Sequence, residues 1–280
     1  MKLLRMIWIA LATIVAVYAA VCAYIYMAQD RMFYFPTKDF AVNPDDYDLK
    51  FQDIFINVGQ DETIHGWYFP QARSQESART VLFCHGNGGN ISHRMETVIF
   101  LLQRGVNVMM FDYRGYGRSS GRPTETNTYG DVKAAYDWLI TEKSAIPNDI
   151  IIFGRSLGGA VAVDLASKVS CGGLIVESTF DSAIEMAKGY FPLFPAGLLI
   201  KYSYNSISKI SKVDCLKLFT HSPVDDLVPF ERGKRLFEAA PEPKTFFEIS
   251  GGHNERTYLD DPGYITVIDN LLKQDGAGRN

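Results

Sequence analysis

Cysteine and histidine are scarce in this chain of 280 residues. The cysteines are Cys22, Cys84, Cys171 and Cys215, and there are five histidines. Four cysteines are too few for a disulfide scaffold, and without a C-x-x-C pair no structural metal site is expected. A surplus of positive charge is also lacking, because the formal net charge is −4. A nucleic-acid partner is therefore not expected.

Charge is absent from one long stretch near the N-terminus. From Met6 to Gln29 there is no charged residue, and the first 22 of these residues are almost wholly apolar. At about 1.5 Å per residue they give roughly 33 Å of helix, enough to cross a hydrocarbon core about 30 Å thick. Signal peptides have a shorter apolar region, so residues 1–29 are predicted to be a retained single-pass membrane anchor, with a cleaved signal peptide as the alternative. Lys2 and Arg5 precede the run, which favours an extracytoplasmic position for the rest of the chain.

Residues 30–275 are predicted to form one α/β domain, followed by a tail at 276–280. Hydrophobic residues make up 47% of the chain and charged residues 21%, which excludes a disordered chain. Apolar runs alternate with helical runs, as in a mostly parallel sheet covered by helices on both faces. Residues 71–79 are expected to form a hairpin loop. The expected strands are residues 51–58, 64–69, 80–84, 106–111, 149–153, 174–176, 216–220 and 245–249, and the expected helices are residues 91–104, 127–142, 157–169, 230–239 and 258–272.

The loop after the expected strand 149–153 reads GRSLGG, residues 154–159. The pattern G-x-S-x-G places a serine on a strained turn between a strand and a helix, where glycines remove Cβ atoms that would clash. The helix that follows directs free amides and the positive end of its dipole towards this turn. Ser156 is therefore the candidate nucleophile, and an ordinary turn serine is the alternative.

A serine hydroxyl becomes a nucleophile beside a base, and the base needs a carboxylate to hold it. Two histidines follow Ser156, namely His221 and His253. In folds with this serine turn the order along the chain is serine, acid, histidine. His253 follows the last expected strand in a glycine-rich turn and is the candidate base. His221 precedes the best acidic candidates and is expected to order its own loop.

The acid is expected in the turn HSPVDDLVP, residues 221–229. Adjacent carboxylates in a turn point in different directions, so only one of the two aspartates can face the histidine. Asp225 is the candidate acid, and Asp226 is expected to be solvated or to cap the helix that follows. Glu177 is a third candidate, whose other interpretation is hydrogen bonding to loop amides.

Acyl transfer also needs amide groups directed at the developing oxyanion. One is expected from Leu157, the residue after the nucleophile. The other is expected from Asn87 in the glycine-rich loop HGNGGN, residues 85–90. His85 is then expected to brace this loop rather than transfer a proton.

Together these motifs resemble the serine α/β-hydrolases, over roughly residues 30–272. The branch that looks closest is the BEM46-like one, with the ABHD13- and ABHD17-type proteins, in which an N-terminal membrane segment is often followed by an aromatic–proline stretch such as FYFP at 33–36. The resemblance implies the α/β-hydrolase fold, with Ser156 as nucleophile, Asp225 as acid, His253 as base and the amides of Asn87 and Leu157 as oxyanion hole. The motifs that carry it are HGNGGN (85–90), FDYRGYGRSSGRPTE (111–125), GRSLGG (154–159), EST (177–179), HSPVDDLVP (221–229) and GGHN (251–254).

The sequence departs from this branch at one position. His221 is followed by serine where members commonly have glycine. The cysteine-rich lipidation segment of the depalmitoylating members is absent, so their activity is not carried over.

The predicted activity is hydrolysis of carboxylic esters or thioesters through an acyl-enzyme, without a metal or organic cofactor. A small lid is expected at about residues 180–214, rich in aromatic and aliphatic residues. Its apolar face would suit an acyl chain, and packing of the same residues on the sheet is the alternative. Acyl esters of small-molecule or lipid-like type are therefore the expected substrates. A serine peptidase of the same fold and a non-catalytic binding protein remain as alternatives.

Overall fold

Eight strands form one central sheet in the computed structural model, which describes residues 1–71 and 79–273. Their order is β10-β9-β8-β7-β4-β6-β3-β2; β3 runs opposite to the other strands, so its pairings with β2 and β6 are antiparallel and the remaining pairings are parallel. The mostly parallel sheet predicted from the sequence is thus present. The loop expected at 71–79 and the C-terminal tail lie largely outside the described residues. The strands are β2 (Gln52–Gly59), β3 (Glu62–Phe69), β4 (Thr80–Cys84), β6 (Asn107–Phe111), β7 (Ile150–Arg155), β8 (Gly173–Glu177), β9 (Lys217–His221) and β10 (Lys244–Glu248).

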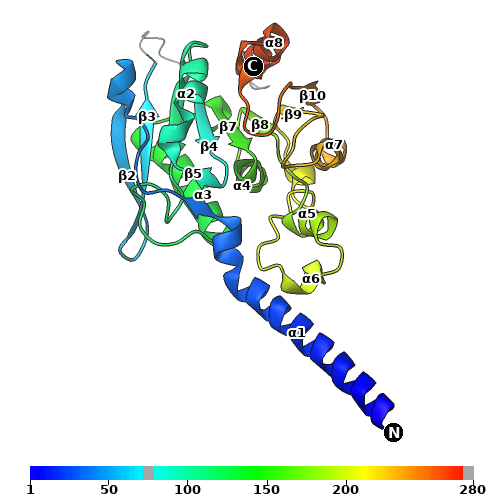
Figure 1. Ribbon diagram of the computed structural model, residues 1–280. Helices are drawn as coiled ribbons and strands as arrows, with labels where there is room; N and C mark the ends of the chain where they lie inside the picture. Colours follow the sequence, from blue (N-terminus) through cyan, green and yellow to red (C-terminus); the bar gives the residue numbers. More distant parts are fainter. Residues whose placement is uncertain (72–78, 274–280) are drawn as a thin grey trace.

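Helices cover both faces of this sheet (Figure 1). Successive residues of a strand point to opposite faces, and β4 shows the consequence. Leu82 contributes to the core under α3 and α4, whereas Val81 and Phe83 contribute to the core under α2 and α8. Both faces are apolar because both are buried. The helices are α2 (Met95–Leu102), α3 (Glu125–Glu142), α4 (Leu157–Ala166), α7 (Phe230–Ala239) and α8 (Pro262–Lys273).

Two expected helices begin later than the sequence pattern suggests. The segment expected to be helical from residue 91 starts with a 3₁₀ helix at Ile91–Arg94, capped by Asn90, before α2 begins. The last helix is preceded by a 3₁₀ helix at Thr257–Asp260, and α8 begins at Pro262. Proline suits a first helical turn because the amide that it lacks would have no partner there.

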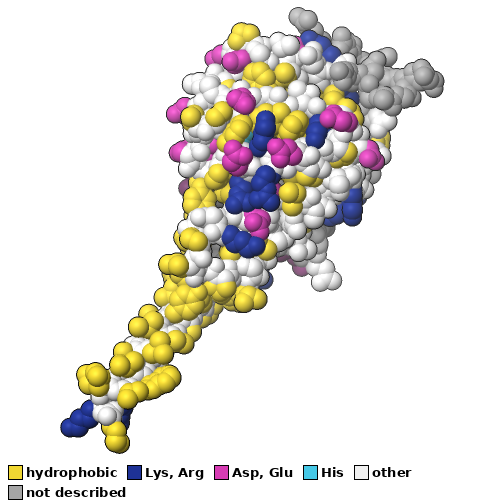
Figure 2. Space-filling view, turned by 90° about the vertical axis from the view of Figure 1, so that its right-hand side faces the viewer, with side chains coloured by type: hydrophobic (Ala, Val, Ile, Leu, Met, Phe, Trp, Pro, Cys, Tyr) yellow, Lys and Arg dark blue, Asp and Glu magenta, His cyan; other side chains and the backbone are white. Residues whose placement is uncertain are grey.

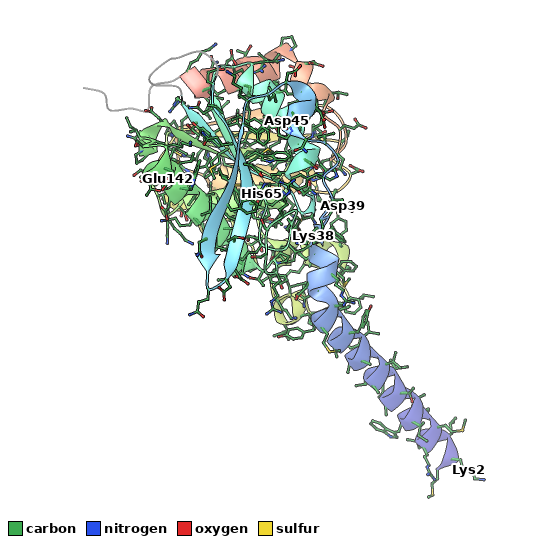
Figure 3. All side chains as sticks on the ribbon, turned by 90° about the vertical axis from the view of Figure 1, so that its left-hand side faces the viewer. Lys2, Lys38, Asp39, Asp45, His65 and Glu142 are labelled. Atoms are coloured by element: carbon green, nitrogen blue, oxygen red, sulfur yellow. The ribbon has the colours of Figure 1, made fainter. Side chains whose placement is uncertain are left out.

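The N-terminal helix α1 (Lys2–Phe33) projects from the globular part (Figure 1). Its most apolar window of 18 residues has a mean hydropathy of 2.3 and is not buried in the protein. Lys2 lies at the free end, and Lys38 and Asp39 lie where the chain enters the globular part (Figure 3). The apolar helix predicted from the sequence is present, and it is long enough to serve as a membrane span, although a signal sequence would look the same.

The end of α1 is attached to the loop that follows β4. The short strand β1 (Phe35–Pro36) pairs in parallel with β5 (Gly88–Gly89) in that loop. The side chain of Asn87 also donates a hydrogen bond to the carbonyl oxygen of Phe33 at 3.1 Å. The N-terminal helix therefore ends at the loop in which the sequence places one oxyanion amide.

A helical insertion, which we call the cap, occupies residues 180–214 between β8 and β9. It contains α5 (Ala183–Tyr190), α6 (Ala196–Leu199) and a 3₁₀ turn at Ile210–Lys212. The cap lies at the end of the globular part from which α1 leaves (Figure 1). The helical segments lie at the position where the sequence suggested a small lid.

Candidate active site

Ser156 occupies the turn between β7 and α4 with φ 54° and ψ −123°. A positive φ is uncommon for a residue with a side chain and costs about 1–3 kcal/mol, which the surrounding structure must supply. The glycines of the motif permit close packing here: a Cβ on Gly158 would lie 2.0 Å from the carbonyl oxygen of Cys84, and one on Gly154 would lie 2.1 Å from the carbonyl oxygen of Gly158. The motif thus lets α4 approach β4 while holding the serine in a strained conformation.

Three loops at the carboxyl ends of parallel strands bring the predicted triad residues together. Ser156 follows β7, Asp225 follows β9 and His253 follows β10. The distance from His253 Nε2 to Ser156 Oγ is 3.0 Å, and that from His253 Nδ1 to Asp225 Oδ2 is 2.7 Å. When Nδ1 carries the imidazole proton, it donates a hydrogen bond to the carboxylate, and Nε2 is free to accept one from the serine hydroxyl. All three side chains are largely buried.

The carboxylate of Asp225 is held by its own loop. Its Oδ1 accepts hydrogen bonds from the amides of Leu227 at 2.9 Å and Val228 at 2.7 Å. Burial alone would raise the pKa of Asp225, but hydrogen bonds from His221 and His253 outweigh it and hold this pKa well below its usual value. The group is therefore an anion at neutral pH.

His221 is the last residue of β9 and so lies just ahead of this loop, not inside it as the sequence suggested, and its ring contacts the same carboxylate from another side. Its Nε2 donates to the carbonyl oxygen of Val228 at 2.9 Å and lies 3.4 Å from Asp225 Oδ2. The ring is buried. Its contacts are consistent with ordering the turn.

One of the two expectations for Asp226 is confirmed, because the residue is exposed to solvent, but the other is wrong. No side-chain hydrogen bond from Asp226 caps α7, which begins at Phe230 after Pro229. Instead its Oδ1 accepts the backbone amide of His253 at 2.8 Å. The two adjacent aspartates do point in different directions, but both hold His253, one through its ring and the other through its backbone. A two-residue motif cannot reveal this, because the second contact depends on where the loop after β10 lies.

Glu177 lies at the end of β8 and does not contact the histidine ring. Its carboxylate accepts from the hydroxyls of Tyr258 at 2.6 Å and Tyr264 at 2.7 Å, and lies 3.1 Å from Arg155 Nε. The expectation that it bonds loop amides is thus wrong, because its partners are side chains. Arg155 also donates to the carbonyl oxygen of His253.

Arg155 is a residue that the sequence did not single out. It occupies the variable position before the nucleophile, and its guanidinium is buried between Glu177 and the histidine loop. A charged residue in a motif position that is otherwise surrounded by apolar strand and helix is the only signal that the sequence contains.

The loop after β4 lies against the serine. A Cβ on Gly86 would lie 3.4 Å from Ser156 Cβ. The carbonyl oxygen of Asn87 accepts from the amide of Phe35 at 3.0 Å and from the hydroxyl of Tyr116 at 2.8 Å. Within the described residues, the amides of Asn87 and Leu157 donate no backbone hydrogen bond.

His85 braces this loop, in line with the expectation. Its Nδ1 donates to the carbonyl oxygen of Gly86 at 2.7 Å, and the hydroxyl of Tyr113 donates to the backbone carbonyl oxygen of His85 at 3.0 Å. Burial, with a smaller contribution from Arg94, lowers the pKa of His85 to about 3. The imidazole is therefore neutral at physiological pH.

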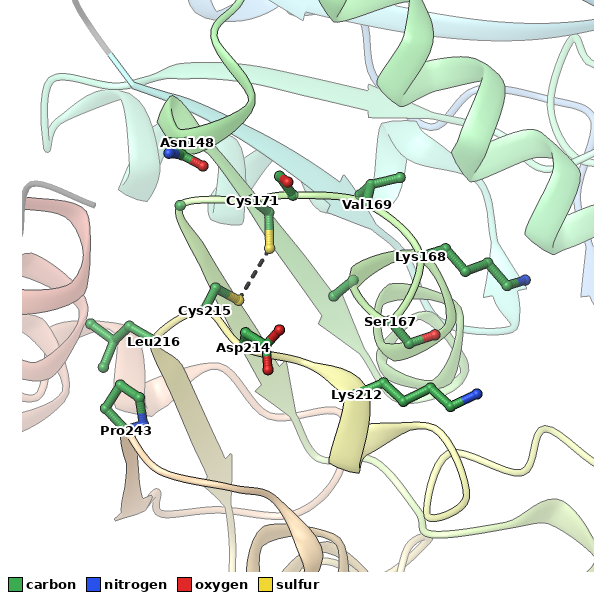
Figure 4. A pocket seen from close by; sticks show the side chains of 13 residues that line it. Asn148, Ser167, Lys168, Val169, Cys171, Lys212, Asp214, Cys215, Leu216 and Pro243 are labelled. Carbon is green, nitrogen blue, oxygen red and sulfur yellow. Dashed lines mark hydrogen bonds between the residues drawn. The ribbon is translucent and has the colours of Figure 1, made fainter. Parts of the chain in front are cut away.

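A cavity of about 640 Å³ lies at the amino-terminal ends of β8 and β9, whereas the triad loops follow the carboxyl ends of the strands (Figure 4). It contains Cys171 and Cys215, both free thiols, with their sulfur atoms 3.1 Å apart. Because the triad loops follow the strands whereas these cysteines precede them, the cavity is separate from Ser156. Among the described residues, no group of three or more His, Cys, Asp or Glu side chains is placed to hold a metal ion.

The alpha/beta hydrolase family matches residues 81–269 of this chain. The chain belongs to that family. An uncharacterized protein of Mycobacterium tuberculosis strain H37Rv is 35% identical to this alpha/beta hydrolase over 264 residues, which is 94% of each chain. The alpha/beta hydrolase domain-containing protein WAV2 of Arabidopsis thaliana is 32% identical over 260 residues, which is 82% of each chain.

Solved structures show the same fold. An esterase of Pyrococcus furiosus, Pf2001, superposes with a TM-score of 0.69 at 22% identity and covers 85% of this chain and 98% of its own. An alpha-beta serine hydrolase homologue from Coxiella burnetii superposes with a TM-score of 0.57 at 22% identity. The superposition covers 79% of this chain and 95% of the homologue. The α/β-hydrolase fold expected from the sequence is confirmed.

Proposed function

We propose that this alpha/beta hydrolase is a serine hydrolase that cleaves carboxylic ester or thioester bonds. The observation that carries the proposal is the continuous hydrogen-bond series from Ser156 Oγ through the His253 ring to Asp225, built on a strained turn. A turn serine without a catalytic role would not need a positive φ and a carboxylate-held imidazole at hydrogen-bond distance.

The proposed reaction has two steps. Ser156 Oγ attacks the acyl carbonyl carbon while His253 Nε2 takes the hydroxyl proton, and the same proton passes to the leaving alkoxide or thiolate as the tetrahedral intermediate collapses. Water, deprotonated by His253, then releases the carboxylic acid from the acyl-enzyme. Asp225 stabilises the imidazolium that forms in each step, because it is anionic and accepts a hydrogen bond from the Nδ1–H group.

The amides of Asn87 and Leu157 are the proposed oxyanion donors. Leu157 is the first residue of α4, so its amide has no partner within the helix. Asn87 follows Gly86, whose backbone lies so close to the serine that an added Cβ would be in van der Waals contact with Ser156 Cβ, at 3.4 Å. Both donors are backbone groups held by secondary structure, so little reorganisation is needed when negative charge develops.

The proposed substrates are acyl esters of small-molecule or lipid-like type. The cap carries exposed apolar side chains next to a helix that is long and apolar enough for a membrane anchor. We further propose that the chain belongs to the BEM46-like branch, that residues 1–29 remain as an anchor, and that the catalytic domain is extracytoplasmic. Residues 30–275 are then the catalytic domain.

A fluorophosphonate probe tests the proposal directly, because it reacts covalently with an activated serine. The wild-type protein is expected to be labelled, and the Ser156→Ala and His253→Ala variants are not. Ser167→Ala, which replaces a half-buried serine at the end of α4 whose hydroxyl donates to the carbonyl oxygen of Asp164, is the control and is expected to label like the wild type. Absence of labelling of the folded wild type would contradict the proposal and favour a non-catalytic binding protein.

A panel of p-nitrophenyl esters of increasing chain length, compared with aminoacyl anilides, separates esterase from peptidase activity. Hydrolysis of the esters with a preference for longer chains is expected. Faster hydrolysis of the anilides would favour the peptidase instead.

A further inference from the structure

The tip of the cap is an uncharged, exposed apolar segment. Residues 189–200 read GYFPLFPAGLLI and contain no charged residue, whereas Lys188 precedes and Lys201 follows them. Leu193 and Leu198 are each 84% exposed. Soluble proteins rarely expose large neighbouring apolar side chains unless these meet a partner.

This segment lies beside the apolar part of α1. The hydroxyl of Tyr18 donates to the carbonyl oxygen of Leu193 at 2.9 Å, and the Tyr18 and Phe194 rings stack with their centroids 5.8 Å apart. In the space-filling view the hydrophobic surface of α1 continues onto the adjoining end of the globular part (Figure 2). Charged side chains are grouped farther from the helix on that face.

The apolar part of α1 and the apolar cap segment end at the same level, where polar side chains of each contact the other. The Nζ atom of Lys201 lies 4.6 Å from the centre of the Tyr26 ring. Three residues later along the helix, Gln29 bonds the backbone of Leu199 at 2.6 Å and of Lys201 at 2.8 Å. Between Tyr18 and Tyr26 the helix rises about 12 Å, so the cap segment runs alongside roughly that length of the apolar helix.

The position of the cap segment along α1 decides whether the cap can stay outside a bilayer that α1 spans. If the span ended before Tyr18, only residues 6–17 of the apolar run would remain, which is about 18 Å of helix. That is far short of a hydrocarbon core about 30 Å thick. The span must therefore include the turn of α1 that contacts Leu193 and Phe194. These two residues then lie within the bilayer leaflet that surrounds this turn.

We propose that cap residues 189–200 insert into the membrane leaflet beside α1, so that the protein takes its acyl substrate directly from the bilayer. Lys188 and Lys201 would lie at the headgroups, and a depth of about 5–10 Å is usual for such interfacial segments. The bilayer is the partner because the apolar surface of the cap is continuous with that of α1.

The inserted segment is connected to the loops of the candidate site. Tyr190, at its start, donates to the carbonyl oxygen of Leu227 in the loop of Asp225 at 2.8 Å. On the other side, the end of α1 accepts the side-chain hydrogen bond of Asn87. Loops that carry two of the proposed site residues thus contact the cap segment and the end of α1. The substrate part of this inference rests on the proposed function and names its class: an ester or thioester whose acyl chain is dissolved in the membrane.

Tryptophan quenching by lipids brominated on the acyl chain tests insertion in the full chain reconstituted into phosphatidylcholine–phosphatidylglycerol vesicles. The added fluorescence of Leu193→Trp is expected to be quenched, and that of Ile146→Trp, on an exposed loop ahead of β7, is not. Trp8 reports in every variant that α1 is in the bilayer. Leu198→Trp replaces Leu193→Trp if that variant does not fold. Unquenched fluorescence at both cap positions, with Trp8 quenched, would overturn the proposal.

Activity separates this inference from the proposed function. The double substitution Leu193→Asp and Leu198→Asp is expected to lower hydrolysis of p-nitrophenyl palmitate in vesicles more than about tenfold, because charged side chains resist entry into the leaflet. Hydrolysis of soluble p-nitrophenyl acetate should change less than about twofold, and Ile146→Asp should affect neither. Equal loss on both substrates would overturn membrane capture alone. A wild type that hydrolyses neither ester would overturn the proposed function, and with it capture of a substrate, while the quenching result still decides insertion.

Discussion

The buried ion pair between Arg155 and Glu177 offers a sharp test of how the fold supports the candidate site. Both side chains are nearly inaccessible, at 6% and 2% exposed, and their nearest atoms are 3.1 Å apart. The guanidinium also donates to the carbonyl oxygen of His253. Replacing Arg155 with methionine keeps much of the side-chain volume and removes the charge.

The expected loss of stability in Arg155→Met follows from the charge of Glu177, which stays buried without its partner. Removing one partner of a buried pair costs about 3–5 kcal/mol, because the other charge is left uncompensated. Glu177 keeps the hydroxyl hydrogen bonds from Tyr258 and Tyr264, so we expect Arg155→Met to lower the free energy of unfolding by about 3 kcal/mol. The loop of His253 loses one attachment but keeps the carboxylates of Asp225 and Asp226. A displacement of the ring by about 1 Å would lower kcat about a hundredfold.

Urea unfolding in mild detergent measures the first effect, and hydrolysis of p-nitrophenyl acetate measures the second. Lys133→Met is the control, because it removes an exposed ion pair with Asp137, and it should cost less than about 1 kcal/mol. Adding Glu177→Gln to Arg155→Met removes the uncompensated charge and is expected to restore part of the stability. An Arg155→Met protein within about 1 kcal/mol of the wild type would refute the reasoning, as would a double variant as unstable as the sum of the two single ones.

Three further predictions concern the same loops. Asp225→Asn is expected to lower kcat about 10⁴-fold with the fold intact by circular dichroism, whereas Asp226→Asn, which weakens only a backbone contact of His253, should cost at most about a hundredfold. Because burial lowers the pKa of His85 to about 3, the unfolded state binds more protons than the folded state between that pH and about 6.5. On acidification this residue should therefore lower the free energy of unfolding by up to about 1.4 kcal/mol per pH unit. Urea titrations of His85→Gln at several pH values should show a shallower fall. An unchanged slope would contradict the lowered pKa of His85. Gly158→Ala places a methyl group 2.0 Å from a carbonyl oxygen and should destabilise the protein by about 3 kcal/mol or more in thermal unfolding, whereas Gly88→Ala, with no atom within 4 Å, should change stability by less than about 1 kcal/mol.

Local patterns in the sequence were enough to predict the fold and to select Ser156, Asp225 and His253, which the structure brings together. Apolar runs such as 80–84 and 149–153 indicate buried parallel strands, because only strands covered on both faces lack a polar side. A serine between glycines at the end of such a run indicates a strained turn, and Ser156 has the positive φ that this requires. Both inferences depend on neighbours along the chain, which a sequence displays directly.

The partners of Asp226, Glu177 and Arg155 depended on tertiary structure. Asp226 meets the backbone of His253, 27 residues later, and Glu177 meets two tyrosines more than 80 residues later. No spacing rule links such positions, because their contact depends on how three separate loops follow their strands.

The sequence by itself determined that an apolar helix precedes an alpha/beta hydrolase domain with an uncharged stretch in its cap. Only the tertiary structure decided that Tyr18 lies beside Leu193 and Phe194. The level of one apolar segment relative to another is set by packing between distant elements, and hydropathy along the chain contains no information on it.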